Sequence, residues 1–154
     1  MRPEAGMLKL TKKTDYGLIA MRHLAEHADQ GSVSAKDLAE LYSIPQEAMA
    51  KILQKLARAG LLASQHGMNG GYMLARDARR ISALEVIRAI DGPLFIASCF
   101  SDKHGDCDQT NRCTVREPLR RVGESIQEVL GRLSIHDMSH DREERDKAEL
   151  VTLA

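Results

Sequence analysis

The chain has 154 residues, with 22 Lys and Arg balanced by 22 Asp and Glu, and only 3 % of its residues are aromatic. This length allows one domain or a domain with an appendage, and the composition is typical of a helical protein. No run approaches the ~18 apolar residues of a membrane span. The first residues, MRPEAGMLKLTKK, lack the apolar centre of a secretory signal, so we expect a cytoplasmic protein with reduced thiols.

The charges are distributed unevenly along the chain. Residues 1–92 hold 13 Lys and Arg against 10 Asp and Glu, whereas residues 93–154 hold 9 against 12. An imbalance this small does not by itself indicate a nucleic-acid-binding protein. Nucleic-acid binding therefore has to be judged from the local pattern of charges.

The first part of the chain predicts a series of short helices. Apolar residues recur at helical spacing from Thr14 to about Ala28, with Thr14 as the expected N-cap and Asp15 in the first turn. A second helix is expected after Ser34, whose hydroxyl can cap it. Pro45 fits the first position of a third helix, which ends at the glycine of ARAG.

The second and third of these helices are joined by a short turn, and the third is cationic. Between Pro45 and Arg58, the charged side chains are Lys51, Lys55 and Arg58 against Glu47 alone. Two short helices of this kind predict a helix-turn-helix whose second helix enters the major groove of DNA.

A β-hairpin is expected directly after the helix pair. Two short apolar runs between Leu61 and Arg76 flank Asn69-Gly70-Gly71, which is a strong hairpin-turn signal. A hairpin in this position is the wing of a winged helix-turn-helix, and the alternative is a plain surface hairpin. The fold class we expect is therefore mainly α, with a small β-hairpin wing.

The C-terminal part predicts two further helices. A short one spans Ser82 to Asp91 and is closed by Gly92, and Pro118 lies in the first turn of a long amphipathic helix. A helix with nothing in its own domain assigned to cover it predicts dimerisation, and the alternative is packing against its own domain. The charge-dense tail is expected to be flexible. The apolar stripe of the long helix comprises Leu119, Val122, Ile126, Val129, Leu130 and Leu133.

All three cysteines of the chain lie in one polar stretch. Cys99, Cys107 and Cys113 have the spacing C-x7-C-x5-C, among Asp, Gly, Ser and Asn residues. Three thiols on one loop can converge on a single point, as thiolate ligands of zinc or of an iron–sulfur cluster must. An odd number of cysteines argues against a closed disulfide framework. The alternative is three unrelated reduced cysteines in a surface loop.

Several of these segments together resemble the winged-helix family of iron–sulfur transcription regulators. They are LKLTKKTDYGLIAMRHLA, SAKDLAELYSIP, AKILQKLARAGLL, HGMNGGYMLAR and the triple-cysteine loop, and the resemblance runs from about Met7 to Met138. Met7 is therefore a candidate for the biological start. The resemblance looks closest to the branch that regulates the SUF system of cluster assembly. It implies a homodimer that binds palindromic operator DNA, with an iron–sulfur cluster (2Fe-2S or 4Fe-4S) in each subunit.

This resemblance divides the chain into four parts. Residues 7–92 match the winged helix-turn-helix DNA-binding domain, 93–117 the cysteine loop that binds the cluster, and 118–138 the dimerisation helix. Residues 139–154 form the charged tail. The first cysteine gap is longer here than in several members and is similar to that of the iron-regulator branch.

The resemblance also implies the ligands of the cluster. Three family cysteines match Cys99, Cys107 and Cys113, but Arg116 stands where the cluster-assembly repressor has a His ligand. The nitric-oxide sensor of the family instead uses an Asp in a T-D-Y segment of the other subunit, which matches Asp15 in Thr14-Asp15-Tyr16. The alternative role of Asp15 is to complement the helix dipole. His104 is a reserve ligand.

DNA contacts are predicted from the helix-turn-helix and its wing. The early turns of the third helix reach base edges in the major groove through Gln46, Glu47, Met49 and Ala50, where Gln can pair with adenine and Glu can accept from cytosine. The remaining side chains are expected at phosphates, at the backbone or in the minor groove. They are Lys51, Lys55, Lys12, Lys13 and Ser34 for phosphates, and His66 and Asn69 on the wing.

Other functions fit the sequence less well. The three thiols could hold zinc or form a thiol–disulfide switch within the same DNA-binding fold. An iron–sulfur electron carrier would have no use for the helix-turn-helix and its wing. No Ser/His/Asp order, phosphate-binding glycine loop or HExxH pair occurs in the sequence, so we expect no enzyme and no small-molecule substrate.

Overall fold

The computed structural model describes residues 10–94 and 114–140 of the chain. Within these ranges the predicted helices and the hairpin are all present, and the expected fold class is confirmed. The three cysteines, His104, residues 7–9 and the tail from residue 141 onward lie outside the described residues. None of the helices in the described part is long and apolar enough to cross a membrane.

Helix α1 (Lys12–Glu26) begins three residues earlier than a cap at Thr14 predicts. Thr11 is its N-cap, and the Thr11 hydroxyl accepts a hydrogen bond from the backbone N–H of Thr14. The expectation that Thr14 caps the helix is therefore wrong. Thr14 is fully buried, and its hydroxyl donates to the carboxylate of Asp91 instead.

Helices α2 (Ala35–Tyr42) and α3 (Gln46–Arg58) form the helix-turn-helix. Ser34 caps α2 as expected, accepting a hydrogen bond from the backbone N–H of Asp37. The turn between the helices requires a left-handed backbone at Ser43, with φ of 54°. Pro45 is the N-cap of α3, whereas the sequence suggested it as the first helical residue, and no side chain caps this helix.

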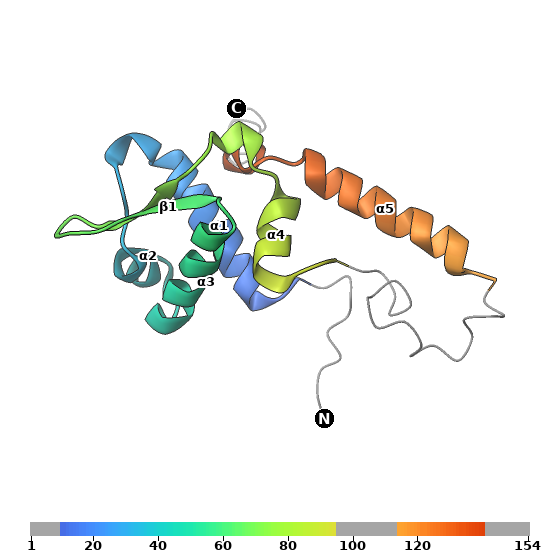
Figure 1. The fold of residues 1–154 in the computed structure, drawn as a ribbon, viewed down its shortest axis with the longest axis horizontal. Helices are drawn as coiled ribbons and strands as arrows, with labels where there is room; N and C mark the ends of the chain where they lie inside the picture. The colour runs from blue at the N-terminus through green and yellow to red at the C-terminus, as the bar shows by residue number, and fades with distance from the viewer. Residues whose placement is uncertain (1–9, 95–113, 141–154) are drawn as a thin grey trace, which may run out of the picture.

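Strands β1 (Leu62–Gln65) and β2 (Gly71–Leu74) form an antiparallel hairpin, in which Leu62 pairs with Leu74 and Gln65 with Gly71. Val33, just before α2, adds a bridge to Tyr72 on the hairpin. The hairpin therefore projects from the helix-turn-helix as a wing, on the side of the molecule opposite to α5 (Figure 1).

Helix α4 (Ala83–Asp91) closes the body of the molecule after the short turn η2 (Ala78–Arg80); a similar turn, η1 (Ala28–Gln30), follows α1. Ser82 and Glu85 form a reciprocal capping box at the start of α4. Helices α1, α3 and α4 pack together around one core. Its fully buried side chains include Met21, Leu38, Met49, Leu53, Leu56, Ile81, Ile87 and Ile135.

Helix α5 (Arg116–Arg132) extends away from this body (Figure 1). The helix is shorter than the expected 118–138 because Leu133 leaves the helical conformation and is its C-cap. The next residues return to the body: Ser134 forms a bridge with Ser82, and Ile135 is fully buried in the core. The chain after α5 therefore anchors this helix to the winged domain.

A buried histidine joins α1 to α2. His23 is 8 % exposed, and its Nδ1 lies 2.8 Å from the hydroxyl of Tyr42. The ring of His27 stacks on His23 with 4.2 Å between ring centroids. Burial, and next the neighbouring His27, lower the pKa of His23, while Glu26 raises it to a smaller extent. His23 is therefore held in a setting that disfavours its protonation.

Candidate DNA-binding interface and cluster-ligand residues

The first turn of α3 presents two of the predicted base-contacting residues to solvent. Gln46 and Glu47 are exposed at the start of the helix, where Pro45 fixes the direction of the chain. Early-turn positions of a recognition helix are those that reach base edges in the major groove. The geometry is therefore compatible with base contacts by Gln46 and Glu47.

Met49 does not belong to this exposed face. Its side chain is fully buried in the core, so the expected contact between Met49 and a base is wrong. The neighbouring residue, Ala48, contributes less to the core than Met49 does. Ala48 is only partly buried.

The two lysines of α3 have different surroundings. Lys51 is exposed and pairs with Glu47 at 3.5 Å, one turn earlier on the same helix. The Nζ of Lys55 instead donates to the backbone carbonyl of Ile90 in α4, at 3.3 Å. Lys51 is therefore directed along the outer face of α3, whereas Lys55 is directed toward the end of a neighbouring helix.

The tip of the wing carries both predicted wing residues. His66 and Asn69 are exposed, and the carbonyl of Asn69 accepts a hydrogen bond of 2.8 Å from the hydroxyl of Ser32. Gly71 lies so close to the segment before α2 that a Cβ at this position would be 2.4 Å from the carbonyl oxygen of Val33. The wing is thus held against the helix-turn-helix. Sequence reasoning missed Met68, which is wholly exposed at the tip.

The other predicted phosphate contacts lie near helix starts. Lys12 and Lys13 are exposed in the first turn of α1. Ser34 is half-buried, and its hydroxyl already accepts a hydrogen bond as the cap of α2. Its backbone N–H lies at a helix N-terminus, where phosphate groups bind favourably.

Asp15 is exposed in the first turn of α1, directly after the buried Thr14. A metal ligand must reach outward from the helix, and Asp15 does so. The adjacent end of α4 leads through Leu94 toward the cysteine segment, and Asp91 in this end accepts hydrogen bonds from Thr11 (2.7 Å) and Thr14 (2.5 Å). The start of α1 therefore lies beside Asp91, which precedes Cys99 by eight residues in the sequence. Sequence reasoning missed Asp91, because no local pattern links it to residues 80 positions away.

The residue types of the predicted ligand set suit iron. Cysteine thiolates hold iron–sulfur clusters, and a carboxylate is a harder, oxygen ligand of iron. In the described part of the chain, no group of three or more His, Cys, Asp and Glu side chains could hold a metal ion.

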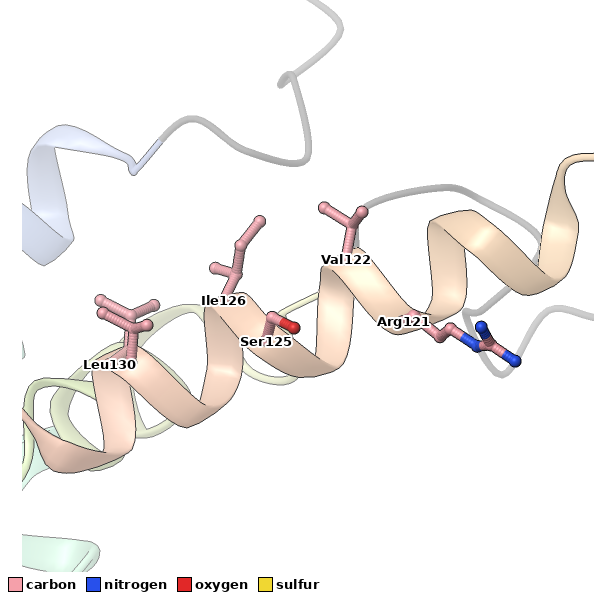
Figure 2. A pocket seen from close by; sticks show the side chains of 6 residues that line it. Arg121, Val122, Ser125, Ile126 and Leu130 are labelled. Atoms are coloured by element: carbon pink, nitrogen blue, oxygen red, sulfur yellow. The ribbon is translucent and has the colours of Figure 1, made fainter.

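The predicted apolar stripe lines an open groove along α5. The groove has a volume of about 450 Å³ and is lined by Arg121, Val122, Ser125, Ile126, Val129 and Leu130. Figure 2 shows Val122, Ile126 and Leu130 projecting from the same side of the helix. Val122 is 47 % exposed and Val129 is 66 % exposed, so the body of the molecule leaves much of this stripe uncovered.

The helix pair α2–α3 followed by the β1–β2 wing defines a winged helix-turn-helix protein of the DNA-binding class. The chain belongs to the Rrf2 family, described as iron-dependent transcriptional regulators, which it matches over residues 10–141. It is a transcriptional regulator and not an enzyme, as the sequence predicts.

Individual relatives agree with this assignment. The HTH-type transcriptional regulator IscR of Xenorhabdus nematophila is 33 % identical over 142 residues, which cover 92 % of this chain and 85 % of the relative. IscR of Vibrio campbellii is 32 % identical over 136 residues, 88 % of this chain and 80 % of the relative.

Two solved structures show the same fold. CymR (YrzC), the global cysteine regulator of B. subtilis, has a TM-score of 0.70 and 28 % identity, covering 86 % of this chain and 96 % of that chain. IscR of T. potens has a TM-score of 0.67 and 33 % identity, covering 90 % of each chain. The expected resemblance to winged-helix regulators is therefore confirmed.

Proposed function

We propose that this chain senses an iron–sulfur cluster and, as a homodimer on palindromic operator DNA, represses genes of cluster assembly, such as the SUF system, or of iron and redox stress. The observation that carries the proposal is the confinement of all three cysteines to residues 99–113. Membership of a family of iron-dependent regulators supports iron as the metal. Such a regulator acts where the DNA is, so the expected cytoplasmic location is part of the proposal.

The proposed ligands are Cys99, Cys107 and Cys113 of one subunit and Asp15 of the other. The exposure of Asp15 at the start of α1 supports its availability to a second subunit. A carboxylate binds iron less firmly than a thiolate in such a cluster, so the Asp15 position is the weak point of the ligand set.

The proposed dimer forms through α5. The stripe of Val122, Ile126 and Val129 lies on a helix that projects from the body, and none of the residues of α5 is buried within one chain. Two such stripes facing each other would bury apolar surface on both helices at once, as closed twofold dimers do.

The proposed mechanism links the cluster ligands to the arrangement of the dimer. A bound iron–sulfur cluster supplies a group whose occupancy responds to oxygen, nitric oxide or iron supply. Asp15 and the three cysteines, drawn from different subunits, would hold the cluster and thereby keep the two subunits in one relative placement. Without Asp15 in this ligand set, the separation of the two α3 helices would change, and DNA affinity with it, because half-site spacing must match that separation.

The first experiment is anaerobic purification followed by iron and sulfide analysis and visible absorbance. We expect a brown protein whose colour is lost when any one of Cys99, Cys107 and Cys113 is replaced by Ala, while the dimer stays folded. A colourless protein that binds zinc, or one that forms only disulfides, would replace the cluster by a zinc or thiol sensor.

The second experiment compares Asp15→Ala with Asp37→Ala. Both residues are exposed acidic side chains in the first turn of a helix, so the two variants lose the same helix-dipole interaction. If Asp15 is a ligand, only Asp15→Ala changes the visible spectrum and speeds cluster loss in air. An unchanged spectrum and decay rate in Asp15→Ala would rule out ligation by this residue.

A further inference from the structure

The C-terminal end of α4 is a junction at which three other helices meet. Asp91 accepts hydrogen bonds from Thr11 and Thr14 at the start of α1. The carbonyl of Ile90 accepts from Lys55 of α3. The carbonyl of Leu94 accepts from Gln127 of α5, at 3.1 Å. These residues, Asp91, Ile90 and Leu94 with their partners, are called the α4 junction below.

The side chains at the α4 junction are also closely packed. Gly17 of α1 faces Ile90, and a Cβ at Gly17 would lie 2.2 Å from the Cδ1 of Ile90 and 3.5 Å from the Cγ2 of Ile52 in α3. The absence of a side chain at Gly17 therefore lets α1, α3 and α4 meet around Ile90, which is 5 % exposed. Because close-packed interiors transmit strain, a shift of one of these helices at Ile90 is passed to the other two.

Charge explains why Lys55 is held there. The last carbonyls of a helix have no partner within the helix and carry partial negative charge, so a cation beside them is stabilising. Ile90 is the next-to-last residue of α4, and its carbonyl is the one that Lys55 contacts. Lys55 thus joins the last turn of α3 to the end of α4, whereas Lys51 pairs with Glu47 of α3 itself.

We propose that Lys55 and Asp91 are positioning residues, which set the orientation of α3 relative to α1 and α5 and thereby the fit of the regulator to its operator. Lys55 does this in place of the phosphate contact that its charge suggests. The inference rests on the proposed role of α3 as the recognition helix. It concerns contacts within one chain and does not depend on which metal the cysteines hold.

The test uses full-length protein and an operator selected by the wild type from a random-sequence pool of DNA duplexes. Affinity for this operator and for random duplex is measured against salt for Lys51→Gln, Lys55→Gln, Asp91→Ala and Asp91→Asn. Lys51→Gln is the matched control, because it removes a charge from the same helix without touching the junction.

We expect the control variant and the junction variants to change DNA binding in different ways. Lys51→Gln should weaken binding to both duplexes and reduce the salt slope by about one unit, as loss of a phosphate contact does. Lys55→Gln and Asp91→Ala should lower operator affinity by roughly 2- to 30-fold, the range of coupling through packed contacts, with random binding and salt slope unchanged. Asp91→Asn, which keeps a hydrogen-bond acceptor, should retain part of the lost affinity.

Positioning also predicts a change in spacing preference. In the junction variants, an operator with one base pair added between its half-sites should lose less affinity, relative to the selected operator, than it does with the wild type. Loss of helix stability alone would lower affinity for both spacings equally. A thermal unfolding curve for each variant shows whether it is folded at the assay temperature, and Asp91→Asn provides the milder change if Asp91→Ala is not.

Three outcomes would overturn the proposal. A reduced salt slope and equal loss on random DNA in Lys55→Gln would make Lys55 a phosphate contact. Unchanged operator affinity in both Asp91 variants would make the junction irrelevant to recognition, while a normal Lys51→Gln effect would leave the proposed function standing. Unchanged binding of every DNA by Lys51→Gln would instead remove α3 as the recognition helix and the junction proposal with it.

Discussion

The winged-helix body and helix α5 cover their apolar side chains in different ways. In the body, each amphipathic helix faces others of the same chain, and Met21, Ile52 and Leu53 are almost completely buried. Helix α5 has 17 residues, and none of them is buried. Helix α5 packs against α4, and the segment that follows it returns to the body, where Ser134 forms a bridge with Ser82.

The difference shows which part of the chain can bury its apolar side chains within one subunit. Most helix stability in proteins comes from packing of the amphipathic face rather than from the helix alone. The body supplies such packing for its own helices, and α5 lacks it over most of its length. We infer that the body folds as one subunit, while α5 reaches full stability in the proposed dimer.

The largest expected effect concerns the body. Leu53→Ala should lower the free energy of unfolding by about 3 kcal/mol, because it removes a fully buried side chain from the core and leaves a cavity. Leu41→Ala is the matched control, since Leu41 is 60 % exposed on α2 and its loss should change stability by less than about 0.5 kcal/mol. Urea unfolding measures both. Equal effects of the two variants would contradict the assignment of the core.

Helix α5 should respond through association instead. Val129→Asp places a charge in the proposed interface and should raise the dimer dissociation constant about 100-fold, equivalent to about 2.7 kcal/mol. Glu128→Ala, beside it and outside the groove lining, should leave dimerisation nearly unchanged. Sedimentation velocity over a range of concentrations measures the dissociation constant. A monomeric wild type, or equal dissociation constants in all three proteins, would remove α5 as the dimer interface.

Local sequence patterns predicted most elements of the body. Amphipathic spacing and the glycine-rich turn located α1–α4 and the wing, and Ser34 was correctly identified as a cap. The errors lie where tertiary contacts outweigh local preference. Thr14 looks like a cap but is buried against Asp91, and Met49 looks like part of the exposed face but fills the core. Both residues are placed by helices distant in the sequence.

The candidate site was predictable to a similar extent. Exposure of Gln46, Glu47 and Lys51 follows from their places on an amphipathic helix. The link from Lys55 to Ile90 does not, because it depends on how α3 and α4 pack. The end of α5 at Arg132 could not be read from its stripe either, since Leu133 continues the apolar spacing while its backbone carbonyl accepts a hydrogen bond from the N–H of Ala83.

A smaller effect is expected at the wing. Gly71→Ala would place a Cβ 2.4 Å from the backbone carbonyl of Val33, which cannot rotate away, so the bridge between Val33 and Tyr72 has to open. We expect a loss of about 1–3 kcal/mol, as for other overpacked sites. Gly131→Ala in α5 is the control, because its nearest neighbour would be 3.7 Å away and alanine favours helix.

Thermal unfolding and operator binding together test the wing. Gly71→Ala should lower both the unfolding temperature and operator affinity, while Gly131→Ala should leave both unchanged or raise the unfolding temperature. A Gly71→Ala protein with wild-type stability would show that the close approach to Val33 is easily relieved.

The last prediction concerns the pH dependence of the body. Burial and the nearby His27 lower the pKa of His23 below the 6.5 of an unperturbed histidine, against the opposing effect of Glu26. The folded state then binds fewer protons than the unfolded state between these two pKa values, so stability is fully present above about pH 6.5 and falls as the pH drops below it. One group contributes a slope of at most about 1.4 kcal/mol per pH unit.

Urea unfolding between pH 7.5 and 5.5 measures this slope. In His23→Gln the slope should be shallower, because the group that gains a proton on unfolding is gone, whereas His66→Gln on the exposed wing should keep the wild-type slope. Identical slopes in the wild type and His23→Gln, or a wild type that becomes more stable as the pH falls, would contradict the buried setting of His23 on α1, where it contacts Tyr42 of α2.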